Sequence, residues 1–182
     1  MLKAAAVVAV VIIVALAAVL AYAATKPDTF RVMRATTVKA PPEKIFPLLN
    51  DLRSFATWSP YEKKDPAMKR SYGGAASGKG ATYEWDGDKN VGQGRLTIAD
   101  SSAPSKVTMD LDFVRPWEAH NIVEFTLEPK GDTTNATTTV TWAMHGPAPY
   151  MAKVMHVFLN MNRMVGDDFE IGLANLKALA EK

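Results

Sequence analysis

Strict alternation of apolar and polar side chains marks the middle of this chain. From Val107 to Phe113, apolar side chains occupy every second position, and Thr or Asp lies between them. A period of two residues predicts a β-strand with one buried and one solvated face. A similar pattern recurs in residues 81–86 and 123–127, and the Thr-rich residues 133–144 favour a further strand. Strands that follow one another at hairpin spacing indicate an antiparallel meander of five or six strands.

One strand is predicted before the meander, and helices are predicted on both sides of it. Residues 30–38 alternate like a strand, and residues 40–43 begin a helix, because proline and an acid suit a first turn. Pro47 is expected to kink this short helix, which precedes a second helical turn at residues 53–57. Apolar residues then recur every three or four positions over residues 154–179, which predicts one long amphipathic helix.

These patterns together predict an α+β domain built on a single curved antiparallel sheet. Such a sheet has one apolar face, which another element must cover. The long C-terminal helix has an apolar stripe, so we expect the sheet to wrap around it. A strongly curved sheet need not close fully onto its helix, and the space that remains would be a cavity.

The first segment of the chain carries no charge over residues 4–24 and consists mainly of Ala, Val, Ile and Leu. A helix needs roughly 20 apolar residues to cross a bilayer, whereas the apolar region of a secretory signal usually spans about 7–15. Length therefore favours an uncleaved transmembrane helix or signal anchor at residues 1–25, followed by one domain at residues 26–182. A cleaved secretory signal is the alternative, because Ala21-Tyr22-Ala23 resembles a cleavage site.

The charges that flank this segment bear on the side of the membrane. Lys3 precedes the segment, and Lys26, Arg31 and Arg34 follow it. The positive-inside tendency favours a cytoplasmic body. A signal anchor would instead place the body outside the cytoplasm.

Composition and motifs exclude several classes of function. The formal net charge is only +2 and no basic run is present, so the chain lacks the electrostatic footprint of a nucleic-acid binder. The absence of cysteine excludes disulfides, thiolate catalysis and cysteine-based zinc sites. No zinc-binding H-E-x-x-H spacing and no G-x-S-x-G nucleophile motif occurs, so neither a metal nor a cofactor is expected. Asn135 formally begins a glycosylation sequon, which we interpret as incidental.

The candidate acid–base residues give no catalytic constellation, so we lean away from an enzyme. His120 follows a turn, His145 ends the last strand, and His156 lies in the C-terminal helix, where each is interpreted as a surface or rim residue. Four acidic residues fall on the polar faces of two predicted strands: Glu84, Asp86, Asp110 and Asp112. Strand alternation places these carboxylates on the outer, solvated face of the sheet.

Residues 58–66 read WSPYEKKDP and follow neither a helical nor a strand period. They lie between the short helices and the meander. Trp58 and Tyr61 are expected to turn their rings inward, either as plugs over one end of a cavity or as caps of the core beneath the helices. Residues 62–65 are expected to form the solvated outer surface of the same connection.

In this order the elements and short motifs resemble the START-like or SRPBCC superfamily, within its polyketide cyclase/dehydrase branch. The matching segments are Val38–Phe46, Trp58–Tyr61, Glu84–Gly87, Val91–Gly94 and Gly166–Lys177. The resemblance implies the helix-grip fold and a hydrophobic pocket between the sheet and the C-terminal helix. Members of this superfamily bind lipids, sterols, polyketides or plant hormones, and some catalyse cyclisation or dehydration.

The aromatic and methionine side chains on the apolar faces are the candidate ligand contacts. A packed core accounts for most of them, but methionine and aromatic rings also suit an apolar cavity. We expect the cavity lining to come from this set: Trp58, Tyr61, Tyr83, Trp85, Phe113, Trp117, Phe125, Trp142, Met144, Phe158, Met161 and Phe169.

Two functions from different classes follow. The first is binding, with possible transport, of a hydrophobic small molecule or lipid by a domain tethered to a membrane through residues 4–24. The alternative is a polyketide cyclase/dehydrase-like enzyme that uses the same cavity, with His120, His145 or a pocket tyrosine as acid or base. A third class is an interaction module whose pocket no longer binds a ligand.

Overall fold

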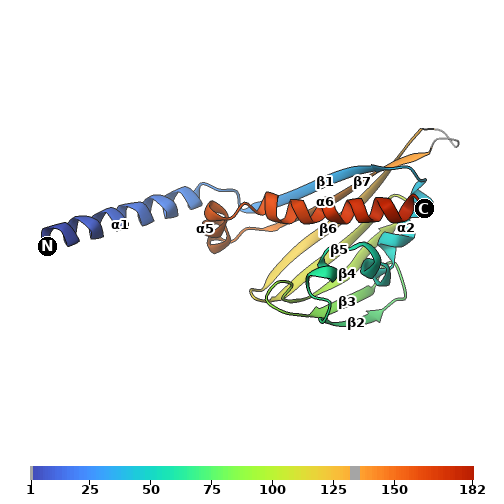
Figure 1. The fold of residues 1–182 in the computed structure, drawn as a ribbon, viewed down its shortest axis with the longest axis horizontal. Helices are drawn as coiled ribbons and strands as arrows, with labels where there is room; N and C mark the ends of the chain where they lie inside the picture. Colours follow the sequence, from blue (N-terminus) through green and yellow to red (C-terminus); the bar gives the residue numbers. More distant parts are fainter. Residues whose placement is uncertain (1, 132–135) are drawn as a thin grey trace.

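The computed structural model describes residues 2–131 and 136–182. One long helix projects from a body in which a curved sheet lies against a second long helix (Figure 1). In chain order the elements are α1 (Leu2–Ala24), β1 (Thr29–Val38), α2 (Pro42–Asn50), a 3-10 turn (Leu52–Ser54), α3 (Phe55–Trp58), α4 (Tyr61–Lys64), β2 (Lys69–Gly74), β3 (Ala81–Asp86), β4 (Gln93–Ser102), β5 (Lys106–Arg115), β6 (Ala119–Lys130), β7 (Thr137–Pro147), α5 (Tyr150–Phe158) and α6 (Met161–Ala180).

The sheet has seven strands in the order β1-β7-β6-β5-β4-β3-β2, and all neighbours pair antiparallel. Strands β2 to β7 form the predicted meander, while β1 pairs with β7 and so closes the edge opposite β2. The predicted strand at residues 133–144 is confirmed from Thr137 onward. Its first residues, and the sequon at Asn135, lie outside the described residues.

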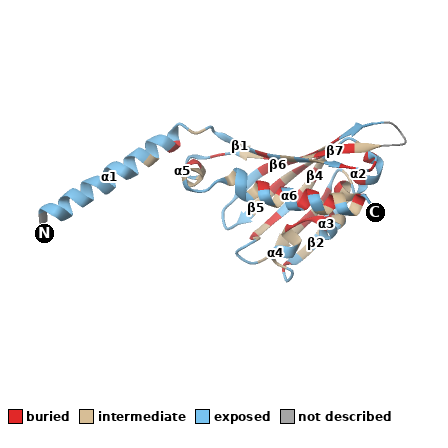
Figure 2. Cartoon of the chain, turned by 45° about the horizontal axis from the view of Figure 1, so that its top comes forward, coloured by how far each residue is buried: buried red, intermediate tan, exposed pale blue. Residues whose placement is uncertain are grey.

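The inner face of the sheet carries the apolar side of each alternating strand. On β5, for example, Val107 and Met109 are fully buried, and Phe125 on β6 is fully buried as well. Helix α6 lies along β1 on this face, α2 contacts β5 and β6, and the short α3 and α4 lie toward β2 (Figure 1 and Figure 2). Buried residues gather on the strands and on the sheet-facing side of α6, whereas α1 is exposed along nearly its whole length (Figure 2). The predicted α+β architecture is therefore confirmed.

The two ends of the sheet differ in what surrounds them. The start of β1, the end of β7 and the β3–β4 and β5–β6 turns lie at one end, next to α5 and the first turns of α6. Because α1 leads into β1, we call this the α1-proximal end. The other end holds α2 and the C-terminus of α6 (Figure 1).

The prediction of a single long C-terminal helix is wrong in one respect. The chain breaks after Phe158 and starts a new helix at Met161. Asn160 occupies the cap position, and its side-chain oxygen accepts a hydrogen bond from the backbone N–H of Arg163 at 3.0 Å. A capping asparagine satisfies a free N–H of the first turn, and this local bond ends one helix and starts the next.

The WSPYEKKDP connection also contains more helix than its sequence predicted. Trp58 ends α3, and Pro60 leads directly into the single turn of α4. Proline suits the start of a helix because its φ angle already matches the helical value. The connection therefore packs as two short helices against α6 rather than as an irregular loop.

Candidate ligand-binding site

A cluster of aromatic rings fills the space between the middle of the sheet and α6. Trp142 on β7 stacks on Phe169 of α6 with ring centroids 4.0 Å apart. Phe125 lies 5.0 Å from Trp142, and Trp58 lies 5.5 Å from it. All four side chains are buried. The structure therefore brings together four of the predicted contact residues, and their rings pack on one another.

One polar atom in this cluster has no partner. The indole N–H of Trp142 is buried, and no acceptor among the described residues lies within hydrogen-bonding distance. By contrast, the indole N–H of Trp58 donates to the carbonyl of Leu48 at 3.0 Å. Most buried donors find an acceptor, so the free N–H of Trp142 marks a place where an acceptor is missing.

Several apolar side chains at the α1-proximal end are only half-buried, although they continue the core. We call them the proximal apolar set: Phe30, Trp85, Val91, Phe113 and Val165. Trp85 and Phe113 meet edge to face with centroids 5.8 Å apart. Gly94 on β4 lies between them, and a Cβ atom there would collide with the Trp85 ring. The missing side chain of Gly94 thus leaves room for the Trp85 indole to cross β4 and form one apolar surface with Phe113.

The other predicted contact residues divide into inner and outer groups. Tyr83 and Met144 are buried on the inner face, and Met161 is half-buried at the start of α6. Trp117 and Phe158 do not join the set, because their side chains are 68% and 71% exposed. Trp117 lies in the β5–β6 turn and Phe158 ends α5, so both point away from the core.

An ionisable cluster lies on the inner side of β2 and β3. The hydroxyl of Tyr83 donates to Glu62 at 2.6 Å, and Arg70 donates to the other carboxylate oxygen at 2.7 Å. The Glu62 side chain is only 9% exposed, so the expectation that residues 62–65 are fully solvated is wrong for this residue. Its partners on β2 and β3 draw it inward. Burial, and then the hydrogen bond to Glu62, raise the pKa of the Tyr83 hydroxyl well above its ordinary value.

Tyr61 is the second tyrosine on this side of the domain. Burial raises the pKa of its hydroxyl, and the nearby charge of Asp168 on α6 adds to the effect. Asp168 also pairs with Lys64 at 2.6 Å. Helix α4 is thus attached to α6 through polar contacts at both of its ends.

The three histidines lie outside the inner face. His120 pairs with Asp112 at 2.6 Å on the outer face, and His145 lies 3.5 Å from Glu124. His156 packs edge-on against Phe30 with centroids 6.0 Å apart. Among residues 2–131 and 136–182, no group of three His, Asp or Glu side chains is placed to hold a metal ion. An enzymatic role for a histidine or tyrosine stays a prediction.

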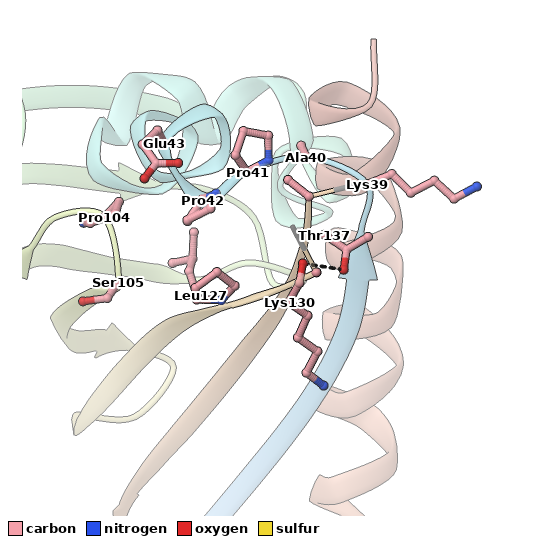
Figure 3. Close-up of a pocket in the computed structure, with 13 residues that line it drawn as sticks. Lys39, Ala40, Pro41, Pro42, Glu43, Pro104, Ser105, Leu127, Lys130 and Thr137 are labelled. Carbon is pink, nitrogen blue, oxygen red and sulfur yellow. Dashed lines mark hydrogen bonds between the residues drawn. The ribbon is translucent and has the colours of Figure 1, made fainter. Parts of the chain in front are cut away.

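Two open pockets lie elsewhere on the surface. The first, of about 710 Å³, lies at the end away from α1, between the start of α2, the end of β6 and the start of β7 (Figure 3). Pro41 and Pro42 form one wall, and Leu127 lies on the opposite side. The second, of about 490 Å³, lies over β2 to β5. Neither pocket lies between the sheet and α6.

The curved antiparallel sheet closed against a long C-terminal helix defines a helix-grip protein of the START-like class. The family model described as "Polyketide cyclase / dehydrase and lipid transport" matches residues 29–181. This match covers nearly the whole chain after α1. The protein therefore belongs to this family, and the resemblance drawn from the sequence is confirmed.

Solved structures agree on the fold. A protein from Nitrosospira multiformis is 19% identical, with a TM-score of 0.58 over 82% of this chain and 94% of the other. The major latex-like protein 151 of Panax ginseng is 12% identical, with a TM-score of 0.58 over 86% of this chain and all (100%) of its own. A protein from Chromobacterium violaceum is 16% identical, with a TM-score of 0.57 over 86% and 99%. No curated protein matches the sequence.

Proposed function

We propose that the protein binds a hydrophobic small molecule or lipid on the inner face of the sheet, at the α1-proximal end, while α1 holds it in a membrane. The proximal apolar set carries this proposal, because these side chains continue the core and yet stay half-exposed. Family membership supports an apolar ligand, since the family description includes lipid transport.

The physical argument rests on the uncovered apolar area. Covering apolar surface stabilises a complex by roughly 25 cal/mol per Å². Trp85 and Phe113 are large rings that are only half-buried, so an apolar ligand would cover part of their exposed surface. The unpartnered N–H of Trp142 would offer a buried donor to a polar atom of such a ligand.

The stacked cluster sets the inner limit of this site. The ring centroids of Trp142 and Phe169 are only 4.0 Å apart, so a ligand cannot pass between the two rings unless α6 moves. Val165 lies one turn before Phe169 on the same side of α6, at the edge of the cluster. Passage of a ligand beyond this stack would therefore require α6 to separate from the sheet.

The tether rests on the length and exposure of α1. Residues 3–24 form a helix long and apolar enough to span a bilayer, and its most apolar 18-residue window has a mean hydropathy of 3.1 and contains no buried residue. A secretory signal has the same properties, so the intact mass of the purified protein decides between the two. A tether at the α1-proximal end would place the proposed site beside the bilayer that stores apolar ligands.

Native mass spectrometry of the full chain, extracted from its host membranes without added ligand, tests the binding proposal. We expect the wild-type protein to carry an apolar molecule. Val165→Trp should lose it, because the larger ring fills the edge of the site. Ile171→Trp is the matched control on the same helix, where the side chain is 52% exposed, and it should retain the molecule.

Two results would count against the proposal. The first is wild-type protein that is consistently empty and takes up no added lipid. The second is equal occupancy in Val165→Trp and the wild-type protein, which would place any bound molecule elsewhere. A mass of the mature protein below that of the full chain, matching cleavage near Ala23, would remove the tether but not the binding site.

A further inference from the structure

We infer that α5 and the β5–β6 turn rest on the surface of a lipid bilayer, so that the domain contacts the membrane through its own body as well as through α1. This inference rests on the proposed tether. The contact surface consists of side chains from α5, the α5–α6 junction and the β5–β6 turn: Tyr150, Met151, Phe158, Leu159, Met164 and Trp117.

One hydrogen bond joins α5 to the last part of α1. The hydroxyl of Tyr150 donates to the backbone carbonyl of Leu20 at 2.9 Å. Leu20 lies four residues before the end of α1, or about 6 Å at 1.5 Å per residue. Helix α5 therefore lies level with the last turn of the apolar helix. If α1 crosses a bilayer, this level corresponds to the headgroup region.

Asp28, in the short segment between α1 and β1, holds α5 in this position. The buried ammonium of Lys153 pairs with the carboxylate of Asp28. The backbone N–H of Ala148, just before α5, donates to the carbonyl of Asp28 at 2.7 Å. Figure 1 shows α5 between α1 and the sheet. These contacts tie the start of α5 to the segment that leaves α1.

The exposed face of α5 and the junction after it is apolar. Met151 is 69% exposed and Phe158 is 71% exposed. Leu159 and Met164 are also exposed. Single exposed apolar residues are ordinary, but a group of them on one surface marks a contact with a protein or a membrane. An amphipathic helix that lies in the interface buries such a face roughly 5–10 Å into the headgroup and acyl boundary.

Aromatic residues lie at the same end of the domain. Trp117 is in the β5–β6 turn, and its ring is 68% exposed. Tyr22, in the last turn of α1, is 52% exposed. Tryptophan and tyrosine are enriched where membrane proteins cross the headgroup region. This placement agrees with a bilayer better than with a protein partner.

Charge favours the same surface. From Gly146 to Gly166 the chain contains Lys153 and Arg163 but no Asp or Glu. The side chain of Arg163 is 82% exposed. Basic residues beside an apolar face are attracted to anionic headgroups. Glu118 lies beside Trp117 in the β5–β6 turn, and Asp28 pairs with the buried Lys153, so Arg163 is the cation that carries this attraction.

Depth-dependent fluorescence quenching tests the inference, because the chain has no cysteine of its own. Single cysteines at Met151→Cys and Phe158→Cys of the full chain would carry an environment-sensitive dye, in vesicles of phosphatidylcholine and phosphatidylglycerol. Val11→Cys in the middle of α1 reports on the tether, and Ile171→Cys is the exposed control on α6. Quenchers are lipids with a nitroxide at a shallow or a deep acyl position.

We expect the shallow nitroxide to remove roughly half or more of the emission at positions 151 and 158, as for an interfacial helix. The deep nitroxide should quench position 11, and neither should quench position 171. Quenching at position 11 with positions 151 and 158 behaving like 171 would overturn the inference and leave the tether intact. Dyes shielded from water but not quenched by lipid would indicate a protein partner and overturn it as well. Loss of quenching at position 11 would remove the tether and the inference with it.

Discussion

The indole ring of Trp142 on β7 lies parallel to the phenyl ring of Phe169 on α6, with centroids 4.0 Å apart and planes 11° apart. This stack attaches the helix to the middle of the sheet. It separates a closed aromatic core from the half-buried side chains at the α1-proximal end. Residues of the closed core hold the fold, whereas the half-buried side chains are free to meet a ligand.

Trp58→Ala should lower the free energy of unfolding by about 3–5 kcal/mol, since it removes a fully buried ring and leaves a cavity. Trp58 is 1% exposed and its N–H bonds to Leu48. Chemical unfolding of the full chain in detergent, followed by near-UV circular dichroism, measures the change. Trp117→Ala is the matched control and should change the stability by less than about 0.5 kcal/mol. Unchanged stability of ligand-free Trp58→Ala would instead identify Trp58 as a ligand contact.

Tyr83→Phe should cost about 1–3 kcal/mol, because the substitution removes a hydrogen bond from the nearly buried carboxylate of Glu62. Tyr72→Phe is the control, since its hydroxyl makes no hydrogen bond to any residue within 2–131 and 136–182. The two variants remove the same atom from neighbouring rings. Equal stabilities of the two variants in chemical unfolding would contradict a structural role for the contact between Tyr83 and Glu62.

Arg34→Lys should loosen the first turns of α6. The guanidinium of Arg34 donates to the carbonyl and side chain of Asn162 at 2.9 and 3.0 Å and to Glu170 at 2.6 Å. A lysine keeps the positive charge but cannot make this forked set of hydrogen bonds. Losing two such bonds should speed local amide exchange by about ten-fold or more. Hydrogen exchange by mass spectrometry would show it in residues 161–170, whereas Arg95→Lys on the outer face should leave this segment unchanged.

His120 should titrate above its ordinary pKa of 6.5, because a hydrogen bond to Asp112 stabilises its protonated form. A raised folded-state pKa means that the contribution to stability is complete below the unfolded value. It is then lost as the pH rises through the folded value. The contribution is small, since both side chains are exposed. NMR titration of the ring should show the pKa fall toward 6.5 in Asp112→Asn; an unchanged pKa would contradict the pairing.

Alternation along single strands predicted the sheet, because burial of one face leaves a period of two in the sequence. The apolar face of β5 is the clearest case, and Val107 and Met109 are buried as expected. Apolar periodicity does not predict the break between α5 and α6, because the apolar stripe runs through it and only the cap at Asn160 marks it. The hydrogen bond at Asn160 therefore divides a segment that apolar periodicity alone would leave as one helix.

The candidate site was less predictable, because it depends on contacts between distant segments. The sequence pattern does not show that Glu62 on α4 turns inward, since its partners Arg70 and Tyr83 come from two strands, β2 and β3. Trp117 and Phe158 are as apolar as the buried rings, and only the three-dimensional path of the chain places them outside. The order of the elements was visible in the sequence, but the direction of individual side chains was not.

Photo-crosslinking with a diazirine-bearing fatty acid tests the central claim most directly. The probe is added to the full chain in vesicles, and cross-linked residues are identified by peptide mass spectrometry. We predict cross-links at Leu96, Leu111 and Phe113 on the inner face of β4 and β5, where the two leucines are buried and Phe113 is half-buried. Cross-links confined to α1 and α5, or gathered at Pro42 and Leu127 in the pocket of Figure 3, would contradict a ligand site between the sheet and α6.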